Sequence, residues 1–274
     1  MTVVVATDLD GTVLFSDRAM APTRPDPARL TPVDVVGERV YGYMTDTVAA
    51  AWARLAGAGA LVPATTRSVA QYTRLRLPGP RPRYAVVCNG GRVLVDGEPD
   101  PAWERGVRAA IAAGGAPFDE VRRRCDAWRA ERGFASLRTV DDLFLYFTVT
   151  VRERWFADFA GEVGAWCRRQ GWRVSLQGRK LYLLPAVLDK APAVAEVAAR
   201  IGAARVVAGG DSLLDERMLR DAAAAIHPAH GELHVTGFSA ANCRTTTGRG
   251  AAAGDEIIGW YREQVGTHEV ADIA

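Results

Sequence analysis

The sequence predicts an α/β protein in which a Rossmann-like core with a parallel sheet is interrupted by an inserted α+β domain. Strand-like and helix-like segments alternate over residues 1–94 and again over 186–274, a pattern typical of parallel strands joined by helices. Residues 95–185 lack this alternation. Hydrophobic residues make up 49% of the 274 residues, which is enough to build a sizeable core. We therefore expect two core segments, 1–94 and 186–274, around an inserted domain at 95–185.

The first core segment predicts a βαβαβ unit that contains a hairpin. The valines at residues 3–5 indicate a buried strand, and Gly57 and Gly59 end the first long helix. The expected elements are a strand at 2–8, an irregular Pro-rich stretch at 21–32, a hairpin at 34–45, a helix at 45–56, a strand at 61–66, a helix at 68–77 and a strand at 84–91. We expect the three strands outside the hairpin to lie in one parallel sheet.

The inserted segment predicts an antiparallel sheet with helices on one face. Its expected elements are helices at 101–113 and 118–131, a strand at 142–151, a helix at 154–170 and a hairpin at 172–185 that turns at 177–179. A domain inserted at this point of a parallel sheet is expected to act as a cap over the carboxyl edge of that sheet.

The second core segment returns to the α/β alternation. Its expected elements are a helix at 188–202, a strand at 204–211, a helix at 214–222, a strand at 222–228 and a last helix at 254–265. The strands are short and apolar, and polar residues follow them. We expect them to extend the same parallel sheet.

Charge and composition argue against several classes of protein. The 34 Lys and Arg residues balance 32 Asp and Glu residues, and the net charge of +2 gives no broad field for nucleic acid or anionic lipid. The four cysteines form no Cys-x-x-Cys pair, which favours reduced thiols over a zinc site or a disulfide framework. No apolar segment predicts a signal peptide or a membrane span. We expect a cytoplasmic protein, monomeric or homodimeric, with no nucleic-acid or membrane partner.

Polar side chains gather at the ends of the predicted strands. Asp8 and Asp10 follow the first strand, and Thr65 and Thr66 follow the next. Lys190, which is one of only two lysines, begins a helix, and Asp211 and Asp215 follow a later strand. Because the carboxyl ends of parallel strands share one edge of the sheet, we expect these side chains to meet there.

These residue types predict phosphoryl transfer with a bound Mg²⁺ ion. Crowded carboxylates repel one another unless a cation lies between them, and a set of oxygen ligands suits Mg²⁺. A carboxylate such as Asp8 can attack phosphorus and form an aspartyl-phosphate, and Asp10 can act as the general acid and base. Lys190 and Thr65 can then stabilise the phosphoryl oxygens.

Four ordered motifs resemble those of the haloacid dehalogenase (HAD) superfamily. They are TDLDGT at 7–12, TTRS at 65–68, DK at 189–190 and GGDSLLDERML at 209–219. VVCNGG at 86–91 and the position of the insert resemble the type IIB, Cof-like branch, and TTRSVAQY is most similar to its sucrose-phosphate phosphatases. The branch also includes mannosyl-phosphoglycerate phosphatase and phosphomannomutase. The resemblance covers roughly residues 1–95 and 186–265 and implies a HAD core.

The resemblance implies a role for each matched residue. Asp8 is the expected nucleophile and metal ligand, and Asp10 is the expected acid and base, with its backbone carbonyl on Mg²⁺. Thr65 binds phosphate, and Lys190 stabilises the nucleophile and the phosphoryl group. The implied metal residues are Asp8, Asp10, Asp211 and Asp215, of which the last supports the site.

Two positions depart from the family pattern. The branch usually has Gly at the position of Thr66 and Asn at the position of Leu214, a polar group that Ser212 can replace. The remaining expected substrate contacts are Thr66, Arg67, Ser212, Arg179 and Lys180. For Arg67 the alternative is a structural role at the start of a helix, and for Arg179 and Lys180 it is a solvated turn.

The sequence therefore predicts a Mg²⁺-dependent phosphatase, a phosphoric monoester hydrolase. Its expected partner is a small phosphate ester, such as a sugar phosphate or a glycosyl-glycerate phosphate. One alternative is a phosphomutase, in which a sugar hydroxyl replaces water as the phosphoryl acceptor. The other is a non-catalytic accessory module, for which the joint presence of Asp8, Asp10, Lys190 and Asp211 has no use.

Overall fold

A computed structural model describes residues 2–22, 24–132, 134, 136–150 and 154–269. The chain divides into two compact units. The core unit is Met1–Asp100 with Lys190–Ala274, and the insert unit is Pro101–Asp189. The boundaries expected from the sequence lay at 94 and 185.

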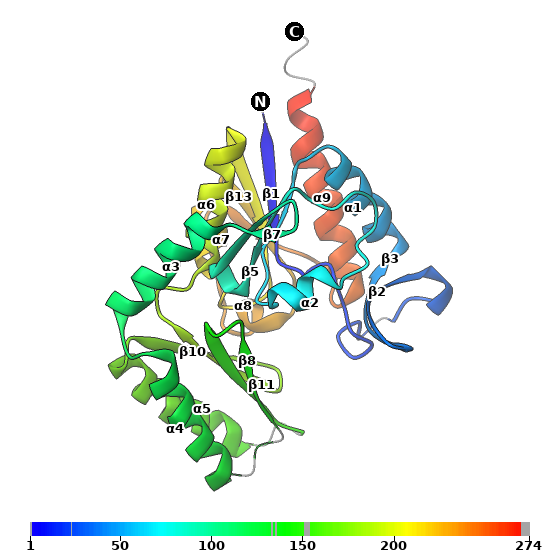
Figure 1. The fold of residues 1–274 in the computed structure, drawn as a ribbon. Coiled ribbons are helices and arrows are strands. Elements are labelled where there is room, and N and C mark those ends of the chain that lie inside the picture. Colours follow the sequence, from blue (N-terminus) through cyan, green and yellow to red (C-terminus); the bar gives the residue numbers. More distant parts are fainter. Residues whose placement is uncertain (1, 23, 133, 135, 151–153, 270–274) are drawn as a thin grey trace. The chain divides into compact units, whose positions relative to one another are not determined.

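A five-stranded parallel sheet forms the centre of the core unit (Figure 1). Its order is β14 (Cys243–Thr245), β13 (Ala224–His227), β12 (Arg205–Gly209), β1 (Val3–Thr7) and β4 (Leu61–Pro63). Every residue of β1 is buried, as its apolar run predicts. Because all the pairings are parallel, the carboxyl ends of β1, β4 and β12 lie at the same edge.

Helices cover both faces of this sheet. Figure 1 shows α1 (Asp46–Gly57) and α9 (Ala251–Glu269) on one side of it and α6 (Lys190–Ile201) and α7 (Glu216–Asp221) on the other. The Thr45 hydroxyl caps α1 by accepting a hydrogen bond from the Val48 N–H at 3.1 Å. The buried face of α1 includes Trp52 and Leu55 and is expected to stabilise the layer by hydrophobic burial.

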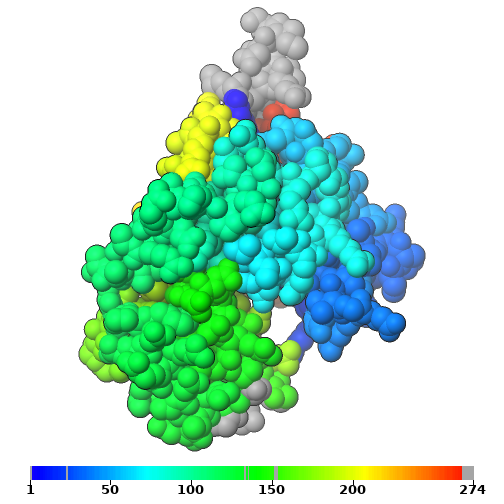
Figure 2. All heavy atoms as spheres, viewed as in Figure 1, coloured from blue at the N-terminus to red at the C-terminus, as the bar shows by residue number. Residues whose placement is uncertain are grey.

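A hairpin and a short helix lie side by side on the surface of the core unit. The hairpin consists of β2 (Leu30–Val36) and β3 (Arg39–Thr45), after the 3-10 helix η1 (Pro27–Arg29). The short helix is α2 (Val69–Thr73). The Arg76 N–H donates to the Val33 carbonyl at 2.9 Å, which ties the segment after α2 to the hairpin. In Figure 2 the two segments are the adjacent dark blue and cyan surfaces.

The expectation of a third parallel strand at 84–91 was wrong in part. β5 (Tyr84–Val87) joins the parallel arrangement only through the bridge between Ala64 and Val86. It pairs antiparallel with β6 (Arg92–Val95), which pairs with β7 (Glu98–Pro99). The left-handed backbone of Cys88 and Asn89, in the turn η2 (Cys88–Gly90), reverses the chain and makes this pairing possible.

Other element boundaries also differ from those expected. The helix predicted at 68–77 is only α2, which ends at Thr73 with Arg74 as its C-cap. The core unit also contains α8 (Gly231–Val235) and β14, two short elements that the sequence analysis did not predict.

The insert unit has a four-stranded antiparallel sheet and three helices. The strand order is β10 (Trp172–Gln177), β11 (Lys180–Pro185), β9 (Phe144–Thr148) and β8 (Ser136–Val140). The helices are α3 (Pro101–Gly114), α4 (Phe118–Arg132) and α5 (Arg154–Arg169). The single strand expected at 142–151 is β9 alone, and it forms a hairpin with the unpredicted β8 through left-handed Asp141 and Asp142. Val151 lies outside the described residues.

The cysteines and the helices bear on two further expectations. All four cysteines are free; Cys88, Cys125 and Cys167 are buried, whereas Cys243 is partly exposed. Within the described part of the chain, every helix is too short or too polar to cross a membrane.

Candidate active site

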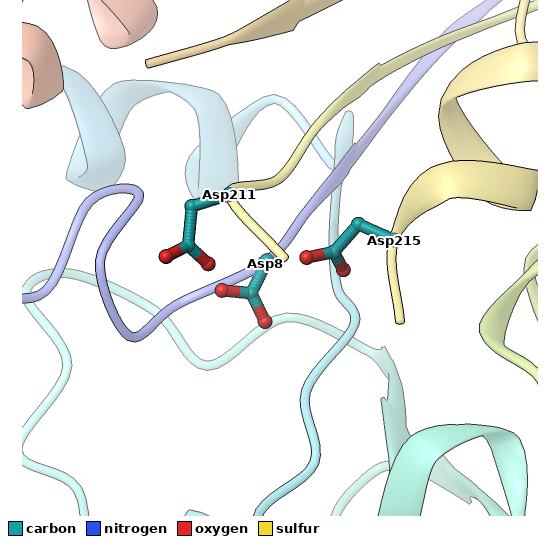
Figure 3. A group of neighbouring side chains, drawn as sticks. All are labelled: Asp8, Asp211 and Asp215. Atoms are coloured by element: carbon teal, nitrogen blue, oxygen red, sulfur yellow. The ribbon is translucent and has the colours of Figure 1, made fainter. Parts of the chain in front are cut away.

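Three aspartates converge at the carboxyl edge of the parallel sheet. Asp8 directly follows β1, and its N–H donates to the Gly209 carbonyl of β12 at 2.9 Å. Asp211 follows β12, and Asp215 precedes α7. One carboxylate oxygen from each aspartate lies within 4.8 Å of the others. Figure 3 shows the three carboxylates gathered together, Asp8 from the segment after β1 and Asp211 and Asp215 from the loop between β12 and α7.

Two glycines allow this close approach. A Cβ atom at Gly210 would lie 2.4 Å from Cγ of Asp215. Gly11 has a φ of +86°, and a Cβ there would lie 2.5 Å from Oδ2 of Asp211. Any larger residue at either position would displace a carboxylate, so both glycines are required by the geometry of the cluster.

Lys190 supplies a buried positive charge. Its side chain is 0% exposed, and Nζ lies 2.6 Å from Asp8 Oδ1 and 2.6 Å from Asp215 Oδ1. Burial lowers the pKa of Lys190, but Asp215 and Asp8 raise it by more, so its pKa lies above the usual range and the side chain stays charged. The compact ammonium fits between two carboxylates, where a planar guanidinium would need more room.

One ammonium does not balance three carboxylates. Burial raises the pKa of Asp8, Lys190 opposes this, and Asp215 and Asp10 add to it, with a result of about 7. Burial, and then Asp8 and Asp215, also raise the pKa of Asp211 well above its ordinary value. A second cation would relieve this excess of negative charge, and the hard oxygen donors fit Mg²⁺.

Asp8 and Asp211 are the best placed to hold such an ion. Asp215 already uses both of its oxygens: Oδ1 faces Lys190, and Oδ2 accepts the Ser212 N–H at 3.0 Å and the Ser212 hydroxyl at 2.8 Å. Asp215 would therefore support the ion site by fixing Lys190 and the loop, and its own oxygens would be less available as ligands.

We expect Mg²⁺ to raise the melting temperature of the protein, and to do so more at pH 8 than at pH 6. Binding requires ionised Asp8, whose pKa of about 7 leaves the carboxyl largely protonated at the lower pH. A Mg²⁺ concentration of 100 times Kd corresponds to a stabilisation of about 2.7 kcal/mol. Thermal unfolding of wild type and Asp211→Asn, with and without Mg²⁺, measures this effect. An equal shift in Asp211→Asn would contradict the site.

Threonines surround the nucleophile candidate. The Thr12 hydroxyl donates to Asp8 Oδ2 at 3.3 Å, a contact that the sequence analysis missed although Thr12 belongs to the DGT motif. Thr65 is buried and follows Ala64, whose N–H donates to the Thr7 carbonyl at 2.7 Å. This pairing places Thr65 beside the end of β1, and Thr66 next to it is partly buried.

Asp10 lies outside the carboxylate cluster. Its side chain is 54% exposed and forms a bidentate pair with Arg67, in which Nε to Oδ2 and Nη2 to Oδ1 are both 2.7 Å. Arg67 also donates from Nη1 to Asp34 Oδ2 at 2.6 Å. The structure therefore brings Arg67 to Asp10, a contact between two predicted site residues that spacing alone did not indicate.

The two basic residues at the turn of the insert hairpin, Arg179 and Lys180, have local partners. Arg179 Nη1 donates to the Thr150 carbonyl at 2.9 Å. Lys180 Nζ lies 5.3 Å from the ring centroid of Tyr146 and 6.0 Å from that of Tyr182. These cation–π contacts place Lys180 beside two aromatic rings on one face of the insert sheet. A contact of Arg179 or Lys180 with substrate stays a prediction.

At position 214, where the branch usually has Asn, this chain has a buried apolar side chain. Leu214 is part of the hydrophobic core. Ser212, the expected polar replacement, bonds to Asp215 through both its N–H and its hydroxyl, so here it orients that carboxylate.

His230 is a further residue that the sequence analysis did not assign to the site. The Gly250 N–H donates to its Nδ1 at 3.1 Å, so Nε2 carries the proton and donates to the Gly11 carbonyl at 2.8 Å. Burial lowers the pKa of His230, which favours this neutral form. His230 thus fixes the loop after Asp8 from a position 219 residues away, a contact without a local sequence signal.

Solved structures with a similar fold identify the fold of this chain. One is the sucrose-phosphatase from Synechocystis sp. PCC6803 in complex with sucrose and phosphate, with a TM-score of 0.62 and 14% identity over 96% of this chain and 98% of that one. The chain has the HAD type IIB fold. A trehalose-6-phosphate phosphatase related protein has a TM-score of 0.59 and 16% identity over 97% of this chain and 99% of its own.

A sugar phosphatase of HAD subclass IIB is also similar, with a TM-score of 0.54 and 12% identity over 97% of this chain and 100% of that one. No protein-family model matches the sequence, and no curated protein gives a significant match. At these identities the similarity establishes the HAD fold, while activity has to be argued from the residues.

Proposed function

We propose that this protein is a Mg²⁺-dependent phosphatase that hydrolyses a small phosphate monoester through an aspartyl-phosphate on Asp8. The observation that carries the proposal is the Asp8 carboxylate, held by buried Lys190 at 2.6 Å and grouped with Asp211 and Asp215 at the edge of the HAD sheet. A binding scaffold gains nothing from grouping three carboxylates, two of them buried, with one buried ammonium, because burying charge is costly.

In the first step an Asp8 oxygen attacks phosphorus and the bond between phosphorus and the leaving oxygen breaks. Asp10 gives its proton to that oxygen. In the second step water attacks the aspartyl-phosphate, Asp10 takes a proton from the water, and inorganic phosphate leaves Asp8. Lys190 keeps Asp8 oriented and offsets phosphoryl charge in both steps. Asp8 and Asp211 would hold Mg²⁺, which would further neutralise the charge on the phosphoryl oxygens.

A sugar phosphate is the substrate class that we propose, with a glycosyl-glycerate phosphate as a second example. The support comes from the similar structures, which are described as a sucrose-phosphatase, a trehalose-6-phosphate phosphatase related protein and a subclass IIB sugar phosphatase. Arg179 and Lys180 are the insert residues proposed to contact the leaving group, and Thr65, Thr66 and Arg67 those proposed to act near the phosphate.

Phosphate release from a panel of sugar phosphates tests the function. We expect Mg²⁺-dependent release from at least one sugar phosphate and no release in the presence of a chelator, because the excess carboxylate charge needs a cation. Measurement of inorganic phosphate ranks the substrates. Release that is unaffected by chelation would contradict the role of Mg²⁺. Isomerised sugar phosphate without inorganic phosphate would indicate the mutase reaction instead.

A further inference from the structure

Asp34 is a buried carboxylate outside the cluster of Asp8, Asp211 and Asp215. It lies on β2, and its side chain is 3% exposed. Oδ1 accepts a hydrogen bond from Arg74 Nε at 2.9 Å, and Oδ2 accepts one from Arg74 Nη2 at 3.2 Å. Oδ2 also faces Arg67 Nη1 at 2.6 Å. Asp34 therefore connects the β2–β3 hairpin to two arginines, Arg67 and Arg74, in the segment that follows β4.

Arg67 joins Asp34 to Asp10. The Arg67 side chain is only 12% exposed, and its Nε and Nη2 atoms hold Asp10 while Nη1 holds Asp34. A guanidinium is planar and rigid, so fixing Nη1 also fixes the direction of the Nε and Nη2 donors. The position of the Asp10 carboxylate thus depends on Asp34, although the two aspartates come from different segments of the chain.

Anchoring of the hairpin does not account for this arrangement. The Arg76 N–H to the Val33 carbonyl and the two Arg74 hydrogen bonds already tie the hairpin to the segment after α2. Asp10 is 54% exposed, so a pair with an arginine that had no other anchor would fix it only weakly, because a solvated side chain keeps much of its freedom. The buried Asp34 contact makes Arg67 a rigid support for Asp10.

We propose that Asp34 is a positioning residue that acts through Arg67 to set the location of the Asp10 carboxylate. This inference rests on the proposed function, in which Asp10 transfers protons in both steps. It makes the β2–β3 hairpin part of the support of the active site. Loss of Asp34 leaves Arg67 free to reorient, and the proton transfers by Asp10 become slower while substrate binding changes little.

Asp34→Asn tests the proposal, since it removes the charge and keeps the shape. We expect kcat on a sugar phosphate to fall by about 10–100-fold, with KM within about 2-fold of wild type. In single-turnover measurements, the rate of Asp34→Asn on p-nitrophenyl phosphate should fall much less, because p-nitrophenolate departs without a proton from Asp10. Equal losses on both substrates would indicate a merely structural role and would overturn the proposal.

Asp255→Asn is the matched control in the same unit. The Thr45 hydroxyl donates to Asp255 Oδ1 at 2.5 Å, so this change loosens the end of the same hairpin without touching Arg67. We expect Asp255→Asn to keep the ratio of rates on the two substrates. Asp34→Asn added to Asp10→Asn should cost no further activity, whereas a full additive loss would contradict action through Asp10.

A crystal structure of Asp34→Asn gives a readout that does not depend on activity. We expect the bidentate pair between Asp10 and Arg67 to be broken or shifted. The wild-type pair, with both contacts kept at 2.7 Å, would overturn the inference even in an enzyme of unknown substrate. An inactive wild type would instead count against the proposed function.

Discussion

Asp8→Asn is expected to lower phosphate release by a factor of about 10⁴ or more, because removal of a nucleophile typically costs that much or more. Asn is a poor nucleophile and forms no stable phosphorylated intermediate. The fold should survive, since the change removes one of three crowded charges and keeps the shape of the side chain. Initial rates on the best sugar phosphate, with melting temperatures measured alongside, check both parts of the prediction.

Wild type and Asp8→Asn together distinguish phosphorylation of Asp8 from the activity of a contaminating phosphatase. Wild type incubated with radiolabelled substrate and quenched in acid should retain label on protein, and Asp8→Asn should retain none. Residual activity in Asp8→Asn close to that of wild type would mean that another residue attacks phosphorus, or that a co-purifying phosphatase does.

Lys190→Met is expected to destabilise the protein by about 3–5 kcal/mol at pH 8, the usual cost of leaving a buried charge without its partner. Lys190 lowers the pKa values of Asp8 and Asp211, so without it both rise further above their values in the unfolded chain. Stability from such groups is present at low pH and is lost as pH rises through the folded pKa. The deficit should therefore shrink between pH 8 and pH 5, as measured by denaturant unfolding.

Lys180→Met is the matched control, because it makes the same replacement at the only other lysine. Lys180 is exposed and is expected to change stability by less than about 0.5 kcal/mol. Mg²⁺ should restore part of the stability of Lys190→Met, since a bound cation offsets the same carboxylates. A deficit of the same size at pH 5 and pH 8 would show that Lys190 acts through packing and not through charge.

The sequence alone located most of the residues at the site. Apolar strands that end in Asp8 and Asp211, and a rare lysine that begins a helix, were enough to predict a shared sheet edge. The prediction succeeds because parallel strands align their carboxyl ends, so residues at the ends of different apolar runs lie at the same edge of the sheet. The parallel core and the antiparallel insert followed from the same patterns of hydrophobicity.

The strand predictions were wrong at turns whose residues have left-handed backbone conformations. Left-handed Cys88 and Asn89 send β5 into its own antiparallel sheet, and left-handed Asp141 and Asp142 form the turn that pairs β9 with the unpredicted β8. A pattern of apolar residues carries little information about a positive φ at a residue other than glycine, so these turns could not be predicted from it.

Only the tertiary structure decided which polar groups meet. Asp10 lies two residues from Asp8, yet it pairs with Arg67, and Arg67 in turn joins Asp34 of the hairpin. His230 reaches Gly11 from the other end of the chain. The sequence determined which polar residues stand at each strand end, because those residues directly follow the strand along the chain. The partners of a side chain depend on contacts between distant segments, and those exist only once the sheet, the hairpin and the helices have packed.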